Sequence, residues 1–559
     1  MRPLLPLAAI AALLLAGAAR GASATPPTAT VTSAFAGLSS TDTVPLDPPD
    51  MGVAAGPGFV VQMVNLAMRI WSTGSGAPTV VKTQQLSDFF GQSANSITDP
   101  RIEYDTASAR WFATLSNIDT PAVLLAVSKT SDPTGAWSMY SFTAPGCADQ
   151  PRLGIADGIV VIGADIFSTC ASDSGTPLGG ELWIVNKAQV VAGVTPPAIN
   201  TFGPNPSFST FAPVQSLSST STEYVVSVDN PTSSVVHLLT VDGIPPAAVS
   251  VKTAADIAIT PLQEPPNAQQ PASSSGRQDP VATNDDRILD SVWEKGRLWF
   301  SGNTACIPSG DSFNRACGRI AELATATRTL TWDANVGVAG ADVFFPAIRP
   351  DAVGNLVVVY GESSPTTNPE LVSTVRAPDG TFATPAVIAT SAGPHLRFGR
   401  NNERFGDYFA AGRDPTNPAV IWFAGEIGST VAGGAQGWNT ALGSVLVSGG
   451  GAPPPVVPPV ATAPRLKARA AAARARRVVQ LRYTALDEGT DVRTQLTVKN
   501  PLSTIVYSAT SAKKTLHAGT VYSLPYRTTR PGRFTFCFRS ILPSGAKSAQ
   551  SCAVVTVSR

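Results

Sequence analysis

Arginine and aspartate recur together at the starts of similar segments in the first part of this chain. The pairs are Asp99 with Arg101, Asp149 with Arg152, Asp286 with Arg287, and Arg404 with Asp407. A guanidinium binds a carboxylate through two parallel hydrogen bonds. If the fold gathers the pairs, they predict a ligand site that could bind an anionic group. The alternative, which we favour over catalysis, is that these side chains form salt bridges between neighbouring strands.

Each pair stands near the start of a segment of short apolar or aromatic runs bounded by turn-forming residues. The clearest segment has the runs 110–116, 123–128 and 137–142 after Asp99. The other segments begin near Asp50, Asp149, Glu223, Asp286, Pro346 and Arg404. Seven segments spaced by about 50–70 residues have the length of four-stranded propeller blades. We therefore predict an all-β fold with a seven-bladed β-propeller over residues 25–447, with six or eight blades as alternatives.

A propeller must join its last blade to its first, because an unpaired edge strand would remain exposed. The strand-like residues 30–35 are expected to complete the blade that contains 438–447. The polar, proline-rich insertion at 262–281 is expected to be a solvated loop. A lid over one face of the propeller is the alternative for this insertion.

The amino terminus and the cysteines indicate export. Residues 1–24 combine Arg2, an apolar run over 4–15 and small residues at 22–24, which is the pattern of a secretory signal peptide. Six cysteines fit an oxidising compartment. Of the 15 connectivities that six cysteines allow, we favour pairing between sequence neighbours. The predicted disulfides are Cys147–Cys170, Cys306–Cys317 and Cys537–Cys552.

The carboxyl-terminal part differs from the rest in charge. Residues 448–463 form a Gly/Pro-rich linker, and residues 464–559 contain 17 Lys and Arg against 3 Asp and Glu. Alternating strand-like runs around Cys537 and Cys552 predict an Ig-like β-sandwich. Its basic residues could contact a polyanion such as a cell-wall polymer, an acidic glycan or extracellular DNA. Alternatively they are a solvated strand edge or dock on the acidic propeller.

Several motifs resemble a large family of exported bacterial β-propellers related in fold to sialidases, most of which have no demonstrated activity. The resemblance covers residues 45–447 and rests on DPRIEYDTASARWF, PRLGIADGIVVIGADIF, DDRILDSVWEKGRLWFSGN and RFGDYFAAGRDP. SKTSDPTGAW, at 128–137, is similar to a degenerate Asp-box, a structural turn in that family. The resemblance implies an architecture more than a function. The tail resembles the β-sandwich modules of secreted actinobacterial proteins.

A sialidase would need three arginines around a carboxylate, a Tyr–Glu pair and an aspartic acid/base. Arg101, Arg152, Arg287 and Arg404 are the candidate arginines, and Tyr360 with Glu362 is the candidate pair. The Phe/Tyr-Arg-Ile-Pro signature of sialidases is missing. We found no nucleophile elbow, zinc helix or P-loop.

These observations predict a secreted propeller that binds a carbohydrate, cell-surface or protein ligand through one face, with a basic accessory module. The alternative is a sialidase-type glycoside hydrolase acting on acidic sugars, so catalysis stays open. No metal or other cofactor is expected, although the Asp-rich turn 351–355 leaves Ca²⁺ as an alternative. We expect an extracellular or cell-surface location, with no sequence-specific nucleic acid and no membrane span.

Overall fold

The computed structural model describes residues 26–42, 48–74, 76–171, 175–229, 232–396, 402–430, 436–449, 464–487, 489–542 and 547–559. The chain divides into two compact units, Met1–Val456 and Val457–Arg559. The predicted signal peptide and nearly all of the predicted linker lie outside the described residues. None of the helices in the described residues is both long and apolar enough to cross a membrane.

The first unit is built mainly from antiparallel strands, with two short helices, α1 (Leu86–Phe90) and α2 (Lys187–Val191). All but one of its described strands fall into seven groups of four. The first three groups are β2–β5 (Gly52–Gly56, Phe59–Val64, Ala67–Ser72, Thr79–Gln85), β6–β9 (Ile97–Asp105, Arg110–Asn117, Ala122–Ser128, Trp137–Thr143) and β10–β13 (Cys147–Ile155, Ile159–Phe167, Pro177–Asn186, Ile199–Asn205).

The remaining groups follow in chain order. The fourth contains β14 (Ala212–Pro213), β16 (Glu223–Val228), β17 (Val235–Asp242) and β18 (Ser250–Ala258). The fifth and sixth are β19–β22 (Ile288–Glu294, Arg297–Cys306, Arg315–Ala324, Thr329–Val336) and β23–β26 (Asp342–Pro350, Leu356–Ser364, Thr367–Arg376, Ala386–Thr390). The seventh contains β27 (Ala410–Arg413), β28 (Val420–Thr430), β29 (Gln436–Ser448) and the amino-terminal β1 (Thr28–Ser39).

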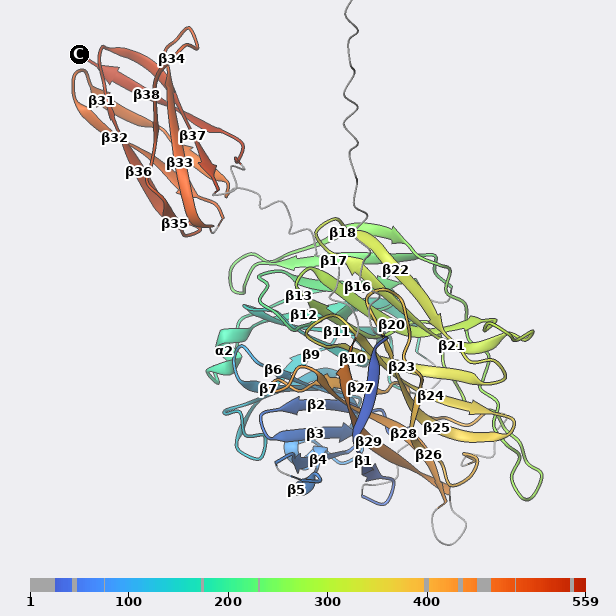
Figure 1. The fold of residues 1–559 in the computed structure, drawn as a ribbon. Helices are drawn as coiled ribbons and strands as arrows, with labels where there is room; N and C mark the ends of the chain where they lie inside the picture. The colour runs from blue at the N-terminus through green and yellow to red at the C-terminus, as the bar shows by residue number, and fades with distance from the viewer. Residues whose placement is uncertain are drawn as a thin grey trace, which may run out of the picture. The chain divides into compact units, whose positions relative to one another are not determined.

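The first strands of the seven groups form a ring. Each contacts the first strand of the next group, in the order β2, β6, β10, β14, β19, β23, β27, and β27 contacts β2 again (Figure 1). Strand β1 completes the last group by antiparallel pairing with β29, with Thr30 opposite Leu446. This is the pairing predicted for residues 30–35. A ring of four-stranded sheets whose last sheet takes a strand from the other end of the chain is a β-propeller.

The fourth group is the least regular. The two-residue strand β15 (Gln215–Ser216) leaves the group and pairs in parallel with both β10 and β19. This bridge joins the third and fifth groups into one nine-stranded sheet. Gln215 lies opposite Ile155 on one side and Val292 on the other.

Sheets that pack face to face provide the core. Fully buried tryptophans lie between them, among them Trp71, Trp111, Trp183, Trp299 and Trp438. Each group therefore depends on its neighbours for burial of its apolar faces. The ring positions its inner strands through these contacts.

The insertion at 262–281 is packed against the ring rather than solvated along its length. Ala268, Gln270 and Val281 are fully buried. Gln270 donates to the carbonyls of Asp279 and His395, at 2.7 and 2.6 Å. The expectation of a solvated loop is therefore wrong for these positions.

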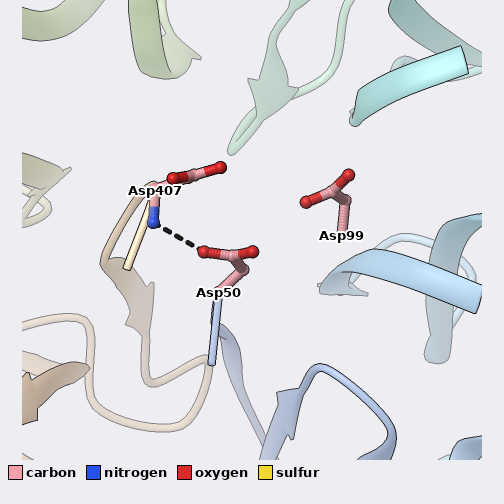
Figure 2. A group of neighbouring side chains, drawn as sticks. All are labelled: Asp50, Asp99 and Asp407. Atoms are coloured by element: carbon pink, nitrogen blue, oxygen red, sulfur yellow. Dashed lines mark hydrogen bonds between the residues drawn. The ribbon is translucent and has the colours of Figure 1, made fainter. Parts of the chain in front are cut away.

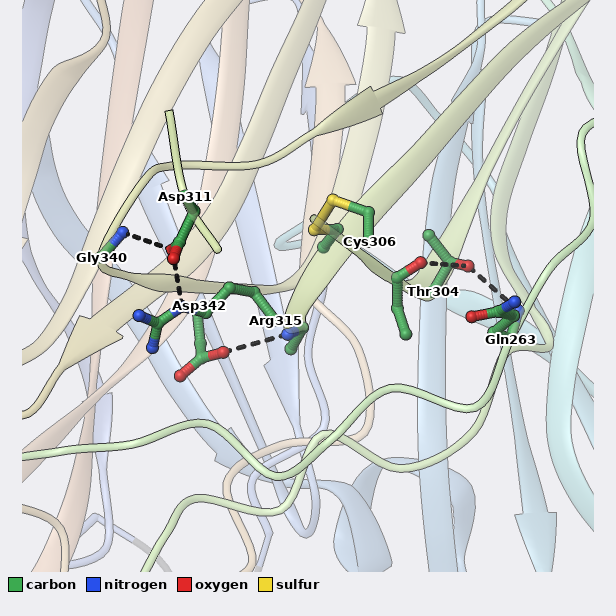
Figure 3. Close-up of a disulfide and its surroundings, with 10 residues drawn as sticks. Gln263, Thr304, Cys306, Asp311, Arg315, Gly340 and Asp342 are labelled. Atoms are coloured by element: carbon green, nitrogen blue, oxygen red, sulfur yellow. Dashed lines mark hydrogen bonds and ion pairs between the residues drawn. A yellow bond between two sulfur atoms is a disulfide. The ribbon is translucent and has the colours of Figure 1, made fainter. Parts of the chain in front are cut away.

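Contacts near the second disulfide help to hold the insertion (Figure 3). Cys306 and Cys317 join the ends of β20 and β21. Beside them the backbone N–H of Gln263 donates to Thr304 Oγ1 at 3.1 Å, and the backbone N–H of Ala305 donates to the backbone carbonyl of Gln263. The start of the insertion thus runs along strand β20.

The second unit has two sheets around one apolar core. One sheet contains β30 (Leu466–Arg469), β32 (Val478–Ala485) and β36 (Val521–Arg527). The other contains β31 (Ala471–Arg474), β38 (Ser551–Ser558), β37 (Gly532–Ile541), β33 (Gly489–Lys499) and β34 (Ile505–Thr510), with β35 (Lys514–Leu516) beside β33. Cys537 and Cys552 lie opposite each other and are bonded. Cys147–Cys170 and Cys306–Cys317 are also bonded, so all three disulfides join sequence neighbours.

Candidate functional site

A cavity of about 760 Å³ opens where the inner strands begin. Its wall is mostly polar and comes from the first, second, third, fifth and seventh groups. The charged and amide residues that line it are Asp50, Asn65, Asn95, Asp99, Asp149, Gln150, Glu264, Asn267, Asn284, Asp285, Arg287, Asn402, Arg404 and Asp407. We call it the entrance cavity.

In five of the strand groups, a residue other than glycine near the start of the inner strand has a positive φ. The residues with positive φ are Asp50 (37°), Asp99 (59°), Gln150 (46°), Asn284 (55°) and Phe345 (55°). Three inner strands, β6, β10 and β23, also carry a shift in pairing register at this point. Such bulges re-aim side chains, and residues held at positive φ cluster at functional sites.

Three carboxylates from different groups meet in the entrance cavity. One oxygen each of Asp50, Asp99 and Asp407 lies within 4.8 Å of the others (Figure 2). Asp50 accepts from the Asp407 amide at 2.6 Å and from Asn65 Nδ2 at 2.8 Å. Asn65 also accepts from the Asp99 amide at 2.8 Å, so it fixes two of the three chain segments. We call these residues the aspartate trio.

The trio is electrostatically unfavourable when fully ionised. Burial, followed by the charges of Asp149 and Asp407, raises the pKa of Asp99 to about 7. Burial, with the charges of Asp407 and Asp99, also raises the pKa of Asp50 well above its usual value. At neutral pH the trio therefore retains protons that solvent-exposed aspartates would lose.

Such a group of carboxylates can hold a hard cation or act as hydrogen-bond partners for hydroxyl groups. Ca²⁺ prefers carboxylate and carbonyl oxygens. The trio would supply three of the six to eight ligands that Ca²⁺ takes. A protonated carboxyl beside an ionised one can also act as a general acid and base.

Two of the four predicted arginines line the entrance cavity, and both are paired with aspartates. Arg287 contacts Asp285 at 2.7 Å, Asp165 at 2.9 Å and Asp149 at 3.1 Å. Since Asp149 and Asp165 belong to the third group and Arg287 precedes β19 of the fifth, this network joins two groups. Arg404 pairs with Asp407 at 2.7 Å.

The other two arginines lie deeper. Arg101 and Arg152 line a separate cavity of about 30 Å³ together with Glu103 and Asp290. Arg152 is buried and lies 3.5 Å from Asp165. The guanidinium of Arg101 stacks on the ring of Tyr408, 3.4 Å from the ring centroid.

Asp286 and Tyr360 do not reach the entrance cavity. Asp286 is fully buried and accepts from the Thr232 amide at 2.9 Å, whereas its neighbour Asp285 lines the cavity. Tyr360 is buried in the apolar cluster that contains Trp299 and Ile348. Its proposed partner Glu362 lies on the same strand, β24, outside the entrance cavity.

The sequence interpretation missed several wall residues. Asp50 starts one of the seven predicted segments, so its position was a usable signal. Asn65 and Asn284 carried no signal, because each depends on contacts with a distant aspartate. Asn284 Nδ2 donates to Asp407 at 2.7 Å, across 123 residues of chain.

A second cavity, of about 380 Å³, lies at the opposite ends of the inner strands. Here two cations of the wall are paired with acids. Lys187 contacts Asp105 at 2.7 Å and donates to the Ala156 carbonyl at 2.9 Å. Arg413 makes two hydrogen bonds to Glu294, at 3.0 and 3.1 Å.

Comparisons with known proteins give only distant likenesses. No protein-family description matches the chain, and no curated protein matches it. A GH32 beta-fructofuranosidase of Bombyx mori is 11% identical, with 82% of this chain and 86% of that chain covered and a TM-score of 0.28. A mutant sialidase of Trypanosoma rangeli is 8% identical (96% and 89% covered, TM-score 0.30), and Drosophila Semaphorin 2a is 7% identical (93% and 98% covered, TM-score 0.35). With such scores, the β-propeller assignment depends on strand order and ring contacts.

Proposed function

We propose that this chain is a secreted, seven-bladed β-propeller that binds a carbohydrate in the entrance cavity. The seven groups of four strands are its blades. The single observation that carries the proposal is the aspartate trio, in which three segments distant in sequence present carboxylates to one polar cavity. Three disulfides are in keeping with an extracellular location.

The wall chemistry favours a hydroxyl-rich ligand. Carboxylates accept hydrogen bonds, and amides both donate and accept, which matches the hydroxyl groups of a sugar. The groups are held before a ligand arrives: Asn65 and the Asp407 amide fix Asp50, and Asn284 fixes Asp407. A prearranged site loses less entropy on binding.

A sialidase-type mechanism has less support. It requires arginines that are available to a substrate carboxylate, yet Arg287, Arg404 and Arg152 lie within ion-pair distance of aspartates. Tyr360 lies in an apolar cluster rather than beside these arginines. Binding therefore remains our first proposal and hydrolysis of acidic sugars the alternative.

A glycan-array screen of residues 25–559 tests the proposal, with Asp407→Asn as the site variant and Asp119→Asn as an exposed control. Losing a charged hydrogen bond should weaken glycan binding by about 10-fold or more. The control should bind like the parent protein. No bound glycan, or equal binding by Asp407→Asn, would contradict a carbohydrate site at the trio.

For the second unit we propose an Ig-like sandwich that contacts polyanions. The solvent side of the sheet β30–β32–β36 carries Lys467, Arg469, Arg482 and Arg527, all exposed. Arg469 and Arg482 lie directly opposite each other. Like charges in this position oppose pairing, and an anionic polymer would relieve the repulsion.

A further inference from the structure

The small cavity between the inner strands has an unusual balance of charges. Its volume is about 30 Å³, and its wall includes Arg101 from β6 and Arg152 from β10. One water needs about 10–15 Å³ of such volume. The cavity therefore has room for about two or three waters, or for one ion somewhat larger than a water.

Both arginines have buried N–H groups without an acceptor. Nε and Nη2 of Arg101 and Nε of Arg152 are inaccessible to solvent and make no hydrogen bond. The other nitrogens of Arg152 donate to Gln150, to its carbonyl at 3.3 Å and to Oε1 at 3.0 Å, and Nη1 also donates to Asp165 Oδ1 at 3.5 Å. An unsatisfied buried donor is costly, and more so when it carries charge.

Arg101 also lacks an ion pair among the described residues, and its guanidinium stacks on the face of Tyr408. The two acids in the same wall are already engaged by a different cation. Arg349 Nη1 donates to both oxygens of Asp290, at 2.8 Å, and Arg349 Nη2 donates to Glu103 at 2.6 Å. Those carboxylates therefore have a closer cation than Arg101.

We propose that Arg101 and Arg152 bind a small monovalent anion, of the size of chloride, in this cavity. An anion would accept from the free N–H groups and supply the counter-charge that Arg101 lacks. Water could satisfy some of the donors, but it would leave a buried positive charge uncompensated. The site lies apart from the trio and does not depend on the function proposed for the entrance cavity.

Crystals of residues 25–559 grown or soaked in sodium bromide test the inference directly, because bromide replaces chloride and is located by anomalous scattering. The expected result is a bromide peak within hydrogen-bonding distance of both Arg101 and Arg152. Electron density for water alone in bromide-soaked crystals would overturn the inference. This measurement needs no variant.

Thermal unfolding gives an independent readout. At constant ionic strength, replacing chloride with gluconate, which is too large for the cavity, should lower the unfolding midpoint by about 2 °C. Arg101→Gln should remove this difference, whereas the exposed control Arg328→Gln should retain it. Equal midpoints in both salts for the parent protein, or an unchanged difference in a folded Arg101→Gln, would contradict a chloride site.

Discussion

The two ends of the inner strands handle buried charge in opposite ways. At the ends that form the 380 Å³ cavity, two buried acids each have a cation: Lys187 for Asp105 and Arg413 for Glu294. At the entrance cavity, Asp50 and Asp99 accept hydrogen bonds from amides but have no ion pair among the described residues. Pairing removes the cost of leaving a buried charge without a counter-charge, whereas the surplus negative charge at the entrance supports the ligand site proposed there.

Breaking a matched pair should have the largest effect. Lys187→Met should lower the free energy of unfolding by about 3–5 kcal/mol, because it leaves the buried carboxylate of Asp105 without a cation. Chemical unfolding of residues 25–559 measures this change. Lys295→Met is the control, since the Lys295 side chain is 67% exposed and lies 3.8 Å from Glu294.

The control should change the free energy by no more than about 0.5 kcal/mol. If Lys187→Met were as mild as Lys295→Met, the two ends of the strands would not differ in the way described. Binding of a ligand in the entrance cavity should be retained by a folded Lys187→Met variant.

Removing a negative charge from the aspartate trio should stabilise the protein, in contrast to removing a cation from a matched pair. The pKa of Asp99 is raised to about 7, so the folded state holds a proton that the unfolded state loses near pH 4. Stability is therefore lost as pH rises from about 4 to about 7. Asp99→Asn keeps a neutral side chain and should be more stable than the parent protein by about 1–2 kcal/mol at pH 8.

Urea unfolding at pH 4.5 and pH 8 measures this difference, which should be small at the lower pH. Asp119→Asn, at an exposed turn, should show no such pH dependence. A destabilised Asp99→Asn at pH 8 would mean that the trio is a structural element, with charge that the fold requires.

The sequence predicted the architecture of the first unit well. Periodic apolar runs located the strands, and residues 30–35 were correctly matched to the edge of β29. The strands could be located from the sequence because the pattern of apolar residues that marks a strand lies within the strand itself. The pairing of neighbouring cysteines could also be predicted from the sequence, since Cys306–Cys317 and Cys537–Cys552 each join adjacent antiparallel strands.

The side-chain directions could not be predicted. A shift of one residue turns a strand residue to the other face, and several inner strands shift register at the entrance. Asp285 and Asp286 precede β19 in a segment without strand pairing, just after Asn284 with its positive φ of 55°, and there Asp285 lines the cavity while the predicted Asp286 is buried. Arg101 follows Asp99 by two residues, yet it lines the deeper cavity.

A buried acid outside both cavities separates the effect of burial from the effect of neighbouring charges, and its expected change in stability is the smallest. Glu181, on β12, is 4% exposed, and its Oε2 has no hydrogen-bond partner. Burial alone raises its pKa to about 7, without the charges that act on Asp99. Its contribution to stability should therefore also be lost as pH rises from about 4.5 to about 7.

Glu181→Gln should consequently stabilise the protein at pH 8 by about 1 kcal/mol, after allowance for partial access of water. The same urea unfolding at two pH values measures it. A larger gain for Asp99→Asn than for Glu181→Gln gives the cost of bringing Asp50, Asp99 and Asp407 together. Equal gains would show that burial accounts for most of the free-energy cost of Asp99 at pH 8. Repulsion among the three aspartates would then add little to that cost.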